Sequence, residues 1–202
     1  MAITINGSGT ITGVSAGGLP DGSITADDLA STLDISGKTV TLPSDVGGIT
    51  TGKVLQIVNA TKTDTFTTTS TSYVDITGLS ASITPSSTSS KILVSVCIST
   101  SNSVANWWNH FIVLRGSTTL DIGDSSSNRS SVCMSAAIAS YEHTQTKAIE
   151  LLDSPSTTSS TTYKVQMKVQ GQTGTINRCG IDYDNINGQR TVSTITLMEI
   201  AG

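Results

Sequence analysis

The sequence predicts an all-β protein, and three observations support this fold class. The 202 residues include 31 serines and 33 threonines, and threonine favours strands whereas serine favours turns. Charged residues make up only 13% of the chain, and 18 glycines punctuate it. From Lys53 onward, short apolar runs alternate with turn residues, which is typical of many short strands.

The first 52 residues contain two local signals. The stretch "ITINGSGTIT" predicts two very short strands around a glycine-rich turn. The stretch "GSITADDLASTL" predicts one small helix, because Thr25 and Asp28 have capping-box spacing and Ile24 and Leu29 occupy hydrophobic-staple positions. A helix this short is marginal by itself in water.

Residues 1–52 carry too few apolar side chains to close a core within one chain. Ordering each residue costs roughly 1–2 kcal/mol of backbone entropy, which apolar burial must offset. We therefore expect 1–52 to be either disordered or ordered by contact with other copies or another protein, and the well-formed helix start favours the second. Its contact face would comprise Ile24, Leu29 and Leu33.

Residues 53–202 are predicted to form the second domain, a C-terminal β-sandwich head of jelly-roll type. An interruption of the apolar alternation at Gly78 indicates a β-bulge. No period of 20–50 residues repeats, which disfavours propellers and solenoids. The expected strands are 53–59, 63–69, 72–84, 91–100, 107–115, 131–140, 146–153, 162–170, 174–179 and 191–200.

The stretch "WWNHFIVLR" at 107–115 has apolar residues at both odd and even positions. Because alternate residues of a strand point to opposite faces, both faces of this strand should be buried. A two-layer sandwich covers one face, and either long loops or other copies of the chain would cover the second. The simpler explanation is a symmetric oligomer. If the strands run up and down, the loops at 84–90, 117–130, 154–160 and 180–190 gather at one end.

Charge and composition exclude several partner classes. The net charge is −4 and no run of Lys or Arg occurs, so no nucleic-acid partner is predicted. No secretion signal and no apolar run long enough for a membrane span is present, which predicts assembly in a cytoplasm without membrane insertion. Cys97, Cys133 and Cys179 are widely spaced and expected to be reduced, buried thiols.

Two motif-like stretches fail on chemistry, and no cofactor or metal is predicted. Gly47, Gly52 and Lys53 have P-loop spacing, but Val54 stands where Mg²⁺ coordination needs Ser or Thr. Asp182 and Asp184 alternate as in a calcium loop, yet Ile186 occupies the next ligand position and no Glu closes the site.

Catalysis is the weaker hypothesis. The chain has only two histidines: His110 lies in the doubly apolar strand, and His143 lies in a turn. No nucleophile-elbow motif and no catalytic acid pair stands out. Trp107 and Trp108 are assigned to packing, with a sugar-binding platform as the alternative. The predicted ligand-binding residues, all in polar loops, are Asn128, Arg129, Asp182, Tyr183, Asp184, Asn185 and Arg190.

The opening "MAITINGSGTITGVSAGGLPDGSITADDLAS" resembles the N-terminal module of small tail-fibre and virion-fibre proteins of tailed bacteriophages, notably marine and cyanobacterial phages. The stretches "GKVLQIVNATKTDTFTTTSTSYVDITGLSASITPSSTSSKILVSV", "LLDSPSTTSSTTYKVQ" and "STITLMEI" resemble the β-rich module that ends such chains. The middle, from Ser99 to about Gln145, carries the least resemblance.

The resemblance implies a homotrimer in the virion, with jelly-roll heads around a threefold axis. Residues 1–52 would be the N-terminal attachment and trimerisation segment, and they would attach to another virion protein, either a tail adaptor or tube or the capsid. The heads would recognise a host cell-surface glycan or protein, so the expected function is a non-enzymatic tail fibre. The alternatives are a head fibre or capsid decoration without a specific receptor and, less favoured, a polysaccharide-degrading enzyme.

Overall fold

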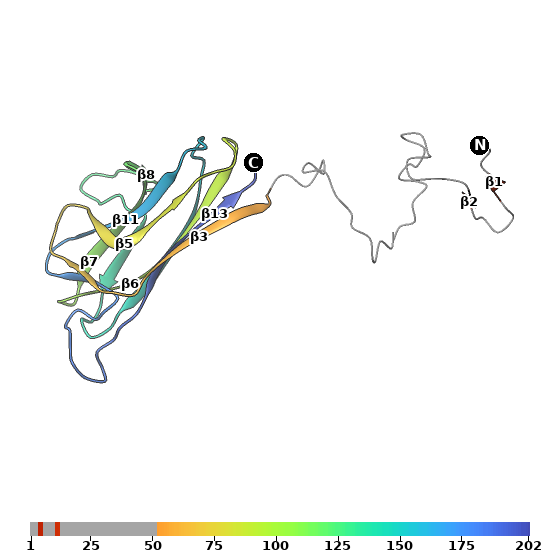
Figure 1. Cartoon of the computed structure of the whole chain (residues 1–202). Coiled ribbons are helices and arrows are strands. Elements are labelled where there is room, and N and C mark those ends of the chain that lie inside the picture. Colours follow the sequence, from red (N-terminus) through yellow and green to blue (C-terminus); the bar gives the residue numbers. More distant parts are fainter. Residues whose placement is uncertain (1–3, 6–10, 13–51) are drawn as a thin grey trace. The chain divides into compact units, whose positions relative to one another are not determined.

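The computed structural model describes residues 4–5, 11–12 and 52–202 (Figure 1). Near the N-terminus, β1 (Thr4–Ile5) pairs antiparallel with β2 (Ile11–Thr12), which confirms the two short strands expected there. The expected helix, with Ile24, Leu29 and Leu33, lies outside the described residues. The division of the chain at residue 52 stays a prediction.

Residues 52–202 form an all-β sandwich of two antiparallel sheets, and the described residues contain no helix. The six-stranded sheet contains β3 (Val54–Lys62), β4 (Phe66–Thr68), β6 (Lys91–Asn102), β10 (Gln145–Asp153), β12 (Gly174–Ile176) and β13 (Ser193–Ile200). The five-stranded sheet contains β5 (Val74–Ile83), β7 (Trp107–Arg115), β8 (Thr118–Leu120), β9 (Met134–Ile138) and β11 (Thr161–Val169).

At three places two strands lie end to end along the same neighbouring strand or pair of strands, and we call each such end-to-end pair an interrupted strand path. When each path is counted as one strand, each sheet is four strands wide. β12 and β13 run in the same direction along one edge of β6, and β4 continues β3 beside them. β8 and β9 likewise share one edge of β7. The segments 121–133 and 177–192 are therefore excursions from within a strand path rather than links between neighbouring strands.

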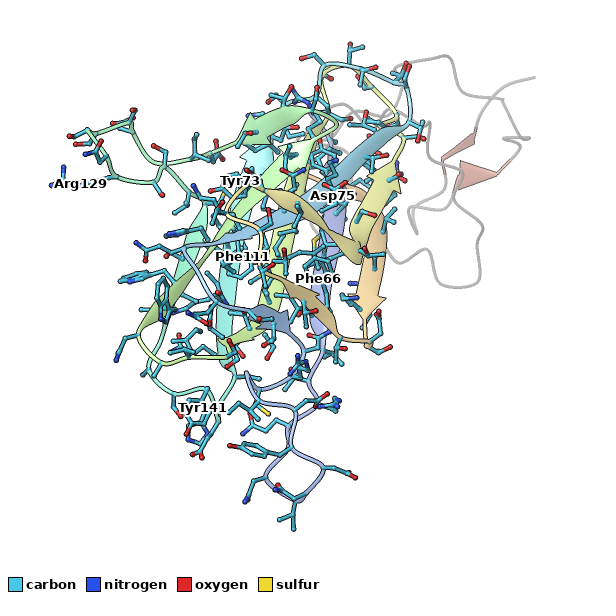
Figure 2. All side chains as sticks on the ribbon, turned by 90° about the vertical axis from the view of Figure 1, so that its left-hand side faces the viewer. Phe66, Tyr73, Asp75, Phe111, Arg129 and Tyr141 are labelled. Atoms are coloured by element: carbon cyan, nitrogen blue, oxygen red, sulfur yellow. The ribbon has the colours of Figure 1, made fainter. Side chains whose placement is uncertain are left out.

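The core lies between the sheets because inward-facing positions alternate with polar ones along each strand. Along β6, Val94, Val96 and Ile98 are fully buried, and they belong to the same cluster as Phe111 of β7. Figure 2 shows all the side chains on the two layers. The strands predicted from the sequence are confirmed, except that the three-residue β8 was expected to be loop.

The bulge expected around Gly78 is confirmed. The pairing of β11 with β5 shifts register between Lys164, which faces Ser80, and Gln166, which faces Asp75. Gly78 adopts a φ of 83°, a left-handed conformation that glycine reaches without a side-chain clash. The extra residues bend β5 where it crosses the core.

The both-face burial of β7 is confirmed only in part, and it does not require a second copy. Ile112 and Leu114, on the outer face, are each only 6% exposed within the single chain. Trp108, on the same face, is 43% exposed. Intrachain cover is therefore sufficient for Ile112 and Leu114, and the oligomer argument drawn from this strand is wrong.

The expectation that four loops share one end of the sandwich is also wrong. Loops 84–90 and 154–160 lie at the end where β3 begins, because Ile92 at the start of β6 pairs with Asp153 at the end of β10. The 177–192 excursion leaves the sheet near Lys62, at the last residue of β3. The 121–133 excursion leaves from the sheet edge beside β7. The expectation assumed that every strand crosses the whole sandwich, so that alternate loops lie at the same end. The interrupted strand paths do not follow this rule.

Buried hydrogen bonds close both ends of the core. At the end where β3 begins, the Glu199 carboxylate accepts hydrogen bonds from Ser86, Ser90 and Gln56. At the opposite end, the buried Asn109 amide donates to Thr100 Oγ1 at 2.9 Å and to the Ser101 carbonyl at 2.7 Å. We call the first end, where Gly52 N donates to the Ala201 carbonyl, the junction end.

Candidate functional site

The candidate site lies opposite the junction end, where two loops meet: residues 139–144, which follow β9, and the 177–192 excursion. We call these two segments the loop pair. Gly180 N donates to the Tyr141 carbonyl at 2.7 Å. The backbone N and Oγ1 of Thr144 both donate to Gln189 Oε1, at 3.2 and 3.1 Å. The two loops are thereby held together as one surface.

Asn177 fixes the base of the 177–192 excursion. Its buried side-chain amide donates to the carbonyls of Lys62, at 2.8 Å, and Asp64, at 3.0 Å. Its Oδ1 accepts from the Ser193 hydroxyl at 2.7 Å, at the other end of the excursion. Asn177 has a φ of 62°, a conformation that asparagine tolerates better than most residues. The excursion thus leaves and rejoins the sheet at a single anchored point.

The tip of the excursion folds back on itself around Gly188. Gly188 N donates to the Asn185 carbonyl at 2.9 Å, and a Cβ placed on Gly188 would lie 2.2 Å from the Tyr183 carbonyl oxygen. A larger residue at this position would open the turn. The turn leaves Ile186 99% exposed, as an isolated apolar side chain in a polar loop.

A hollow of about 670 Å³ lies between the two loops. Its lining combines one carboxylate, one imidazole, one phenol, amides and one apolar side chain, a mixture suited to a polar ligand with some apolar surface. Burial first, and then neighbouring Tyr141 and Glu142, raise the pKa of Tyr183, so its hydroxyl stays a hydrogen-bond donor at neutral pH. The lining residues are Glu142, His143, Tyr183, Asn185, Ile186, Asn187 and Gln189.

The structure brings together only part of the predicted ligand-binding set. Tyr183 and Asn185 line the hollow. Asp182 forms a half-exposed ion pair with Arg190, 2.6 Å between Oδ1 and Nη2, which joins the two limbs of the excursion. Asp184 is exposed on the same loop.

Asn128 and Arg129 lie elsewhere. Both are exposed on the 121–133 excursion, where the Arg129 guanidinium donates to Ser126 Oγ at 2.9 Å. Figure 2 shows Arg129 projecting from one side of the sandwich while Tyr141 lies at the end with the loop pair. The seven predicted residues therefore belong to two separate surfaces.

Sequence reasoning missed the contribution of residues 139–144. Glu142 and His143 line the hollow, but their stretch "YEHTQ" has no motif and resembles any surface turn. Ile186 offered a usable signal, because an apolar residue flanked by asparagines in a polar loop is unusual for a solvated turn.

The structure also describes the metal-ligating side chains, the cysteines and the lack of long apolar helices in the described residues. Among the residues that the structure describes, no three metal-ligating side chains gather into a cluster. Cys97, Cys133 and Cys179 are free; Cys179 is buried, and the other two are half-buried rather than fully buried as expected. Within the described ranges, no helix has the length and hydropathy needed to cross a membrane.

A scan against protein-family models finds no match to this chain, and a search of curated proteins likewise finds none.

Proposed function

We propose that the protein is a non-enzymatic fibre of a tailed bacteriophage, and that its head contacts the host surface through the loop pair. The observation that supports this proposal most strongly is the polarity of the sandwich. The chain enters the head at the junction end, where Gly52 N bonds to the Ala201 carbonyl and Ala201 N to the Lys53 carbonyl. The loop pair, with its hollow, lies at the opposite end.

This polarity suits a protein that is held by its N-terminus and presents its far end outward. In the proposal, residues 1–52 attach to a tail or capsid protein, and the protein resides in the virion after assembly in the host cytoplasm. The receptor is a cell-surface glycan or protein. Loops placed by a rigid scaffold are a common way of building such recognition surfaces.

The strand order supports a jelly-roll assignment. When each interrupted path is counted as one strand, the head has eight strands, which we number in chain order. Across the six-stranded sheet the neighbouring strands are the first, eighth, third and sixth. The other sheet has the order second, seventh, fourth, fifth. Two antiparallel four-stranded sheets with long crossovers between them are what paired Greek keys produce.

An outward-facing apolar row supports the homotrimer. Four side chains lie in direct cross-strand register over the six-stranded sheet: Ile57 faces Met198, Met198 faces Leu93, and Leu93 faces Leu152. Ile57 is 60% exposed and Leu152 is 51% exposed. A continuous row of exposed large apolar residues across a sheet is typical of an interaction surface.

The proposed occupant of this row is a second copy of the chain. The row crosses the half of the sheet nearest the junction end, where the N-terminal segments of all copies would be gathered. Residues of opposite charge flank it, Lys91 two positions from Leu93 and Glu150 two positions from Leu152. In a ring of three copies each contact joins two different patches, so charges of both signs beside the row allow pairing between neighbouring copies.

The loop-pair proposal is tested by adsorption of the labelled full-length protein to a panel of marine bacteria and cyanobacteria. Replacing both Tyr183 and Ile186 by alanine should abolish adsorption, while the circular dichroism spectrum stays unchanged. The matched control is Asn128→Ala, on the separate 121–133 excursion, which should adsorb normally. Equal adsorption by the double variant and the wild type would contradict the role of the loop pair.

A further inference from the structure

Two adjacent tryptophans on β7 have different surroundings. Trp107 is half-buried against Gly171, where an added Cβ would lie only 2.5 Å from the indole ring. Trp108 points to the opposite face and is 43% exposed on the outside of the five-stranded sheet. The packing role assigned to both from the sequence therefore fits Trp107, and the exposed indole of Trp108 needs another explanation.

His110 stacks against the indole ring of Trp108. The two rings are two positions apart on the same face of β7, with centroids 6.3 Å apart and planes 16° from parallel. The Ser135 hydroxyl lies 3.1 Å from His110 Nδ1 and holds the imidazole in place. Burial, together with the charge of Lys168, lowers the pKa of His110, so the imidazole is neutral at pH 7.

A shallow depression of about 230 Å³ is lined by His110 and by Gln170, whose backbone N donates to the Trp108 carbonyl at 3.1 Å. Five of its six lining side chains offer hydrogen-bonding groups, and Lys168 is the only one of the six that is charged at neutral pH. The Lys168 ammonium lies 4.9 Å from the ring centroid of Tyr73. The lining residues are Thr71, His110, Ser130, Lys168, Val169 and Gln170.

We propose that the Trp108 platform, meaning Trp108, His110 and this depression, binds an acidic saccharide. The apolar C–H face of a pyranose ring would stack on the exposed indole, and its hydroxyls would bond to Thr71, Ser130 and Gln170. Lys168 would pair with the carboxylate of the sugar. One exposed ring surrounded by hydrogen-bonding groups matches a sugar better than a protein surface, which would require a wider apolar contact.

This inference rests on the proposed function, because it names the chemical class of a host-surface ligand. It adds a second contact with the host surface, on the outer face of the five-stranded sheet, to the contact that the loop pair makes. The two surfaces can be tested separately, since no residue lines both the hollow and the depression.

The experiment applies the full-length protein to an array of oligosaccharides in which each acidic member is printed beside its carboxyl-reduced, neutral counterpart. The wild type should bind acidic members at least about tenfold more tightly than their neutral counterparts. Trp108→Ala should abolish binding, and Trp108→Phe, which keeps a smaller ring, should retain part of it. Lys168→Gln should remove the preference for the acidic members.

Leu55→Ala is the matched control, because it removes an exposed apolar side chain from β3, in the other sheet, and leaves the platform intact. It should bind the array like the wild type. In solution, the acidic oligosaccharide should also quench tryptophan fluorescence in the wild type but not in Trp108→Phe, where Trp107 remains the only indole.

Failure to bind any saccharide, or undiminished binding by Trp108→Ala, would overturn the inference. So would equal affinity of the wild type for acidic and reduced members. If the protein adsorbs to cells but ignores the array, the proposed function stands and this inference fails. If it binds acidic sugars through Trp108 but never adsorbs to cells, the inference stands and the proposed function fails.

Discussion

The two ends of the sandwich are built differently. At the junction end, the side chain of Glu199 is buried and fixes the 84–90 loop, and the apolar row crosses the adjacent half of the six-stranded sheet. At the opposite end, the loop pair projects from the sheet with Ile186 almost fully exposed. Buried hydrogen bonds close the core at both ends, but only the end opposite the junction end is extended by the loop pair, whose longer loop is anchored at Asn177.

This difference supports the proposed separation of two roles, attachment at the junction end and recognition at the loop pair. Loops anchored by buried groups can vary in sequence at their tips without disturbing the core. The predictions below test whether the anchors, the apolar row and the loop contacts are as independent as the structure implies.

The largest effect on stability is expected at the anchor of the 177–192 excursion. Asn177→Ala leaves two carbonyls and the Ser193 hydroxyl without their partner and places alanine at a φ of 62°. We expect the free energy of unfolding to fall by about 3 kcal/mol, as measured by urea denaturation. Asn187→Ala, at the exposed tip, should change it by less than about 0.5 kcal/mol. Equal losses in both variants would contradict the anchoring role.

The next effect concerns the pH dependence of stability at the junction end. Burial alone would raise the pKa of Glu199, but hydrogen bonds from Ser86, Gln56 and Ser90 outweigh it and lower the pKa to about 2. Because the folded pKa lies below the ordinary value of 4.5, this stabilisation is present above pH 4.5 and is lost as the pH falls toward 2. The loss should be about 2–3 kcal/mol.

Urea denaturation between pH 7 and pH 2.5 measures this loss, and Glu199→Gln should flatten the profile over that range. Glu150→Gln, which changes an exposed carboxylate on β10, should keep the wild-type pH dependence. A profile for Glu199→Gln that still falls as steeply as the wild type would assign the acid sensitivity to other groups.

The apolar row is tested through self-association. Ile57→Asp places a charge at the β3 end of the apolar row and should weaken association by about 2 kcal/mol per copy, the value of burying one isoleucine side chain. Light scattering should show a trimer for the wild type and smaller species for the variant. Thr61→Asp adds the same charge on the same strand, away from the row, and should remain trimeric. Dissociation of both variants alike would remove the row from the interface.

The smallest effect is expected where the two loops touch. Gln189→Ala removes the acceptor for both the amide and the hydroxyl of Thr144, in a part-buried contact where such bonds contribute about 1 kcal/mol. Global stability should hardly change, but hydrogen exchange at the Thr144 amide should accelerate. Unchanged exchange would show that Gln189 does not hold the loops together.

Much of the fold could be predicted from the sequence because alternating apolar residues identify strands directly. β6 and β13 follow that pattern closely, and the bulge at Gly78 interrupts it visibly. β8 was missed because Thr118, Thr119 and Leu120 are indistinguishable from the surrounding hydroxyl-rich loop. Three residues carry too little periodicity to signal a strand.

The candidate site could be predicted only in part, because it depends on topology rather than on local pattern. Tyr183 and Asn185 were identified from the composition of one loop, whereas Glu142 comes from a segment some forty residues earlier. Arg129 was grouped with them because the interrupted strand paths are invisible in the sequence. The strong burial of Ile112 was expected, but its source within the same chain was not.

The most direct test of the division between the two ends compares two single charge substitutions, Ile57→Asp and Ile186→Asp, in the full-length protein. Light scattering and cell adsorption are measured for each. We expect Ile57→Asp to break the trimer, and Ile186→Asp to stay trimeric but to lose adsorption. A trimer that survives Ile57→Asp together with adsorption that survives Ile186→Asp would contradict the separation of attachment from recognition.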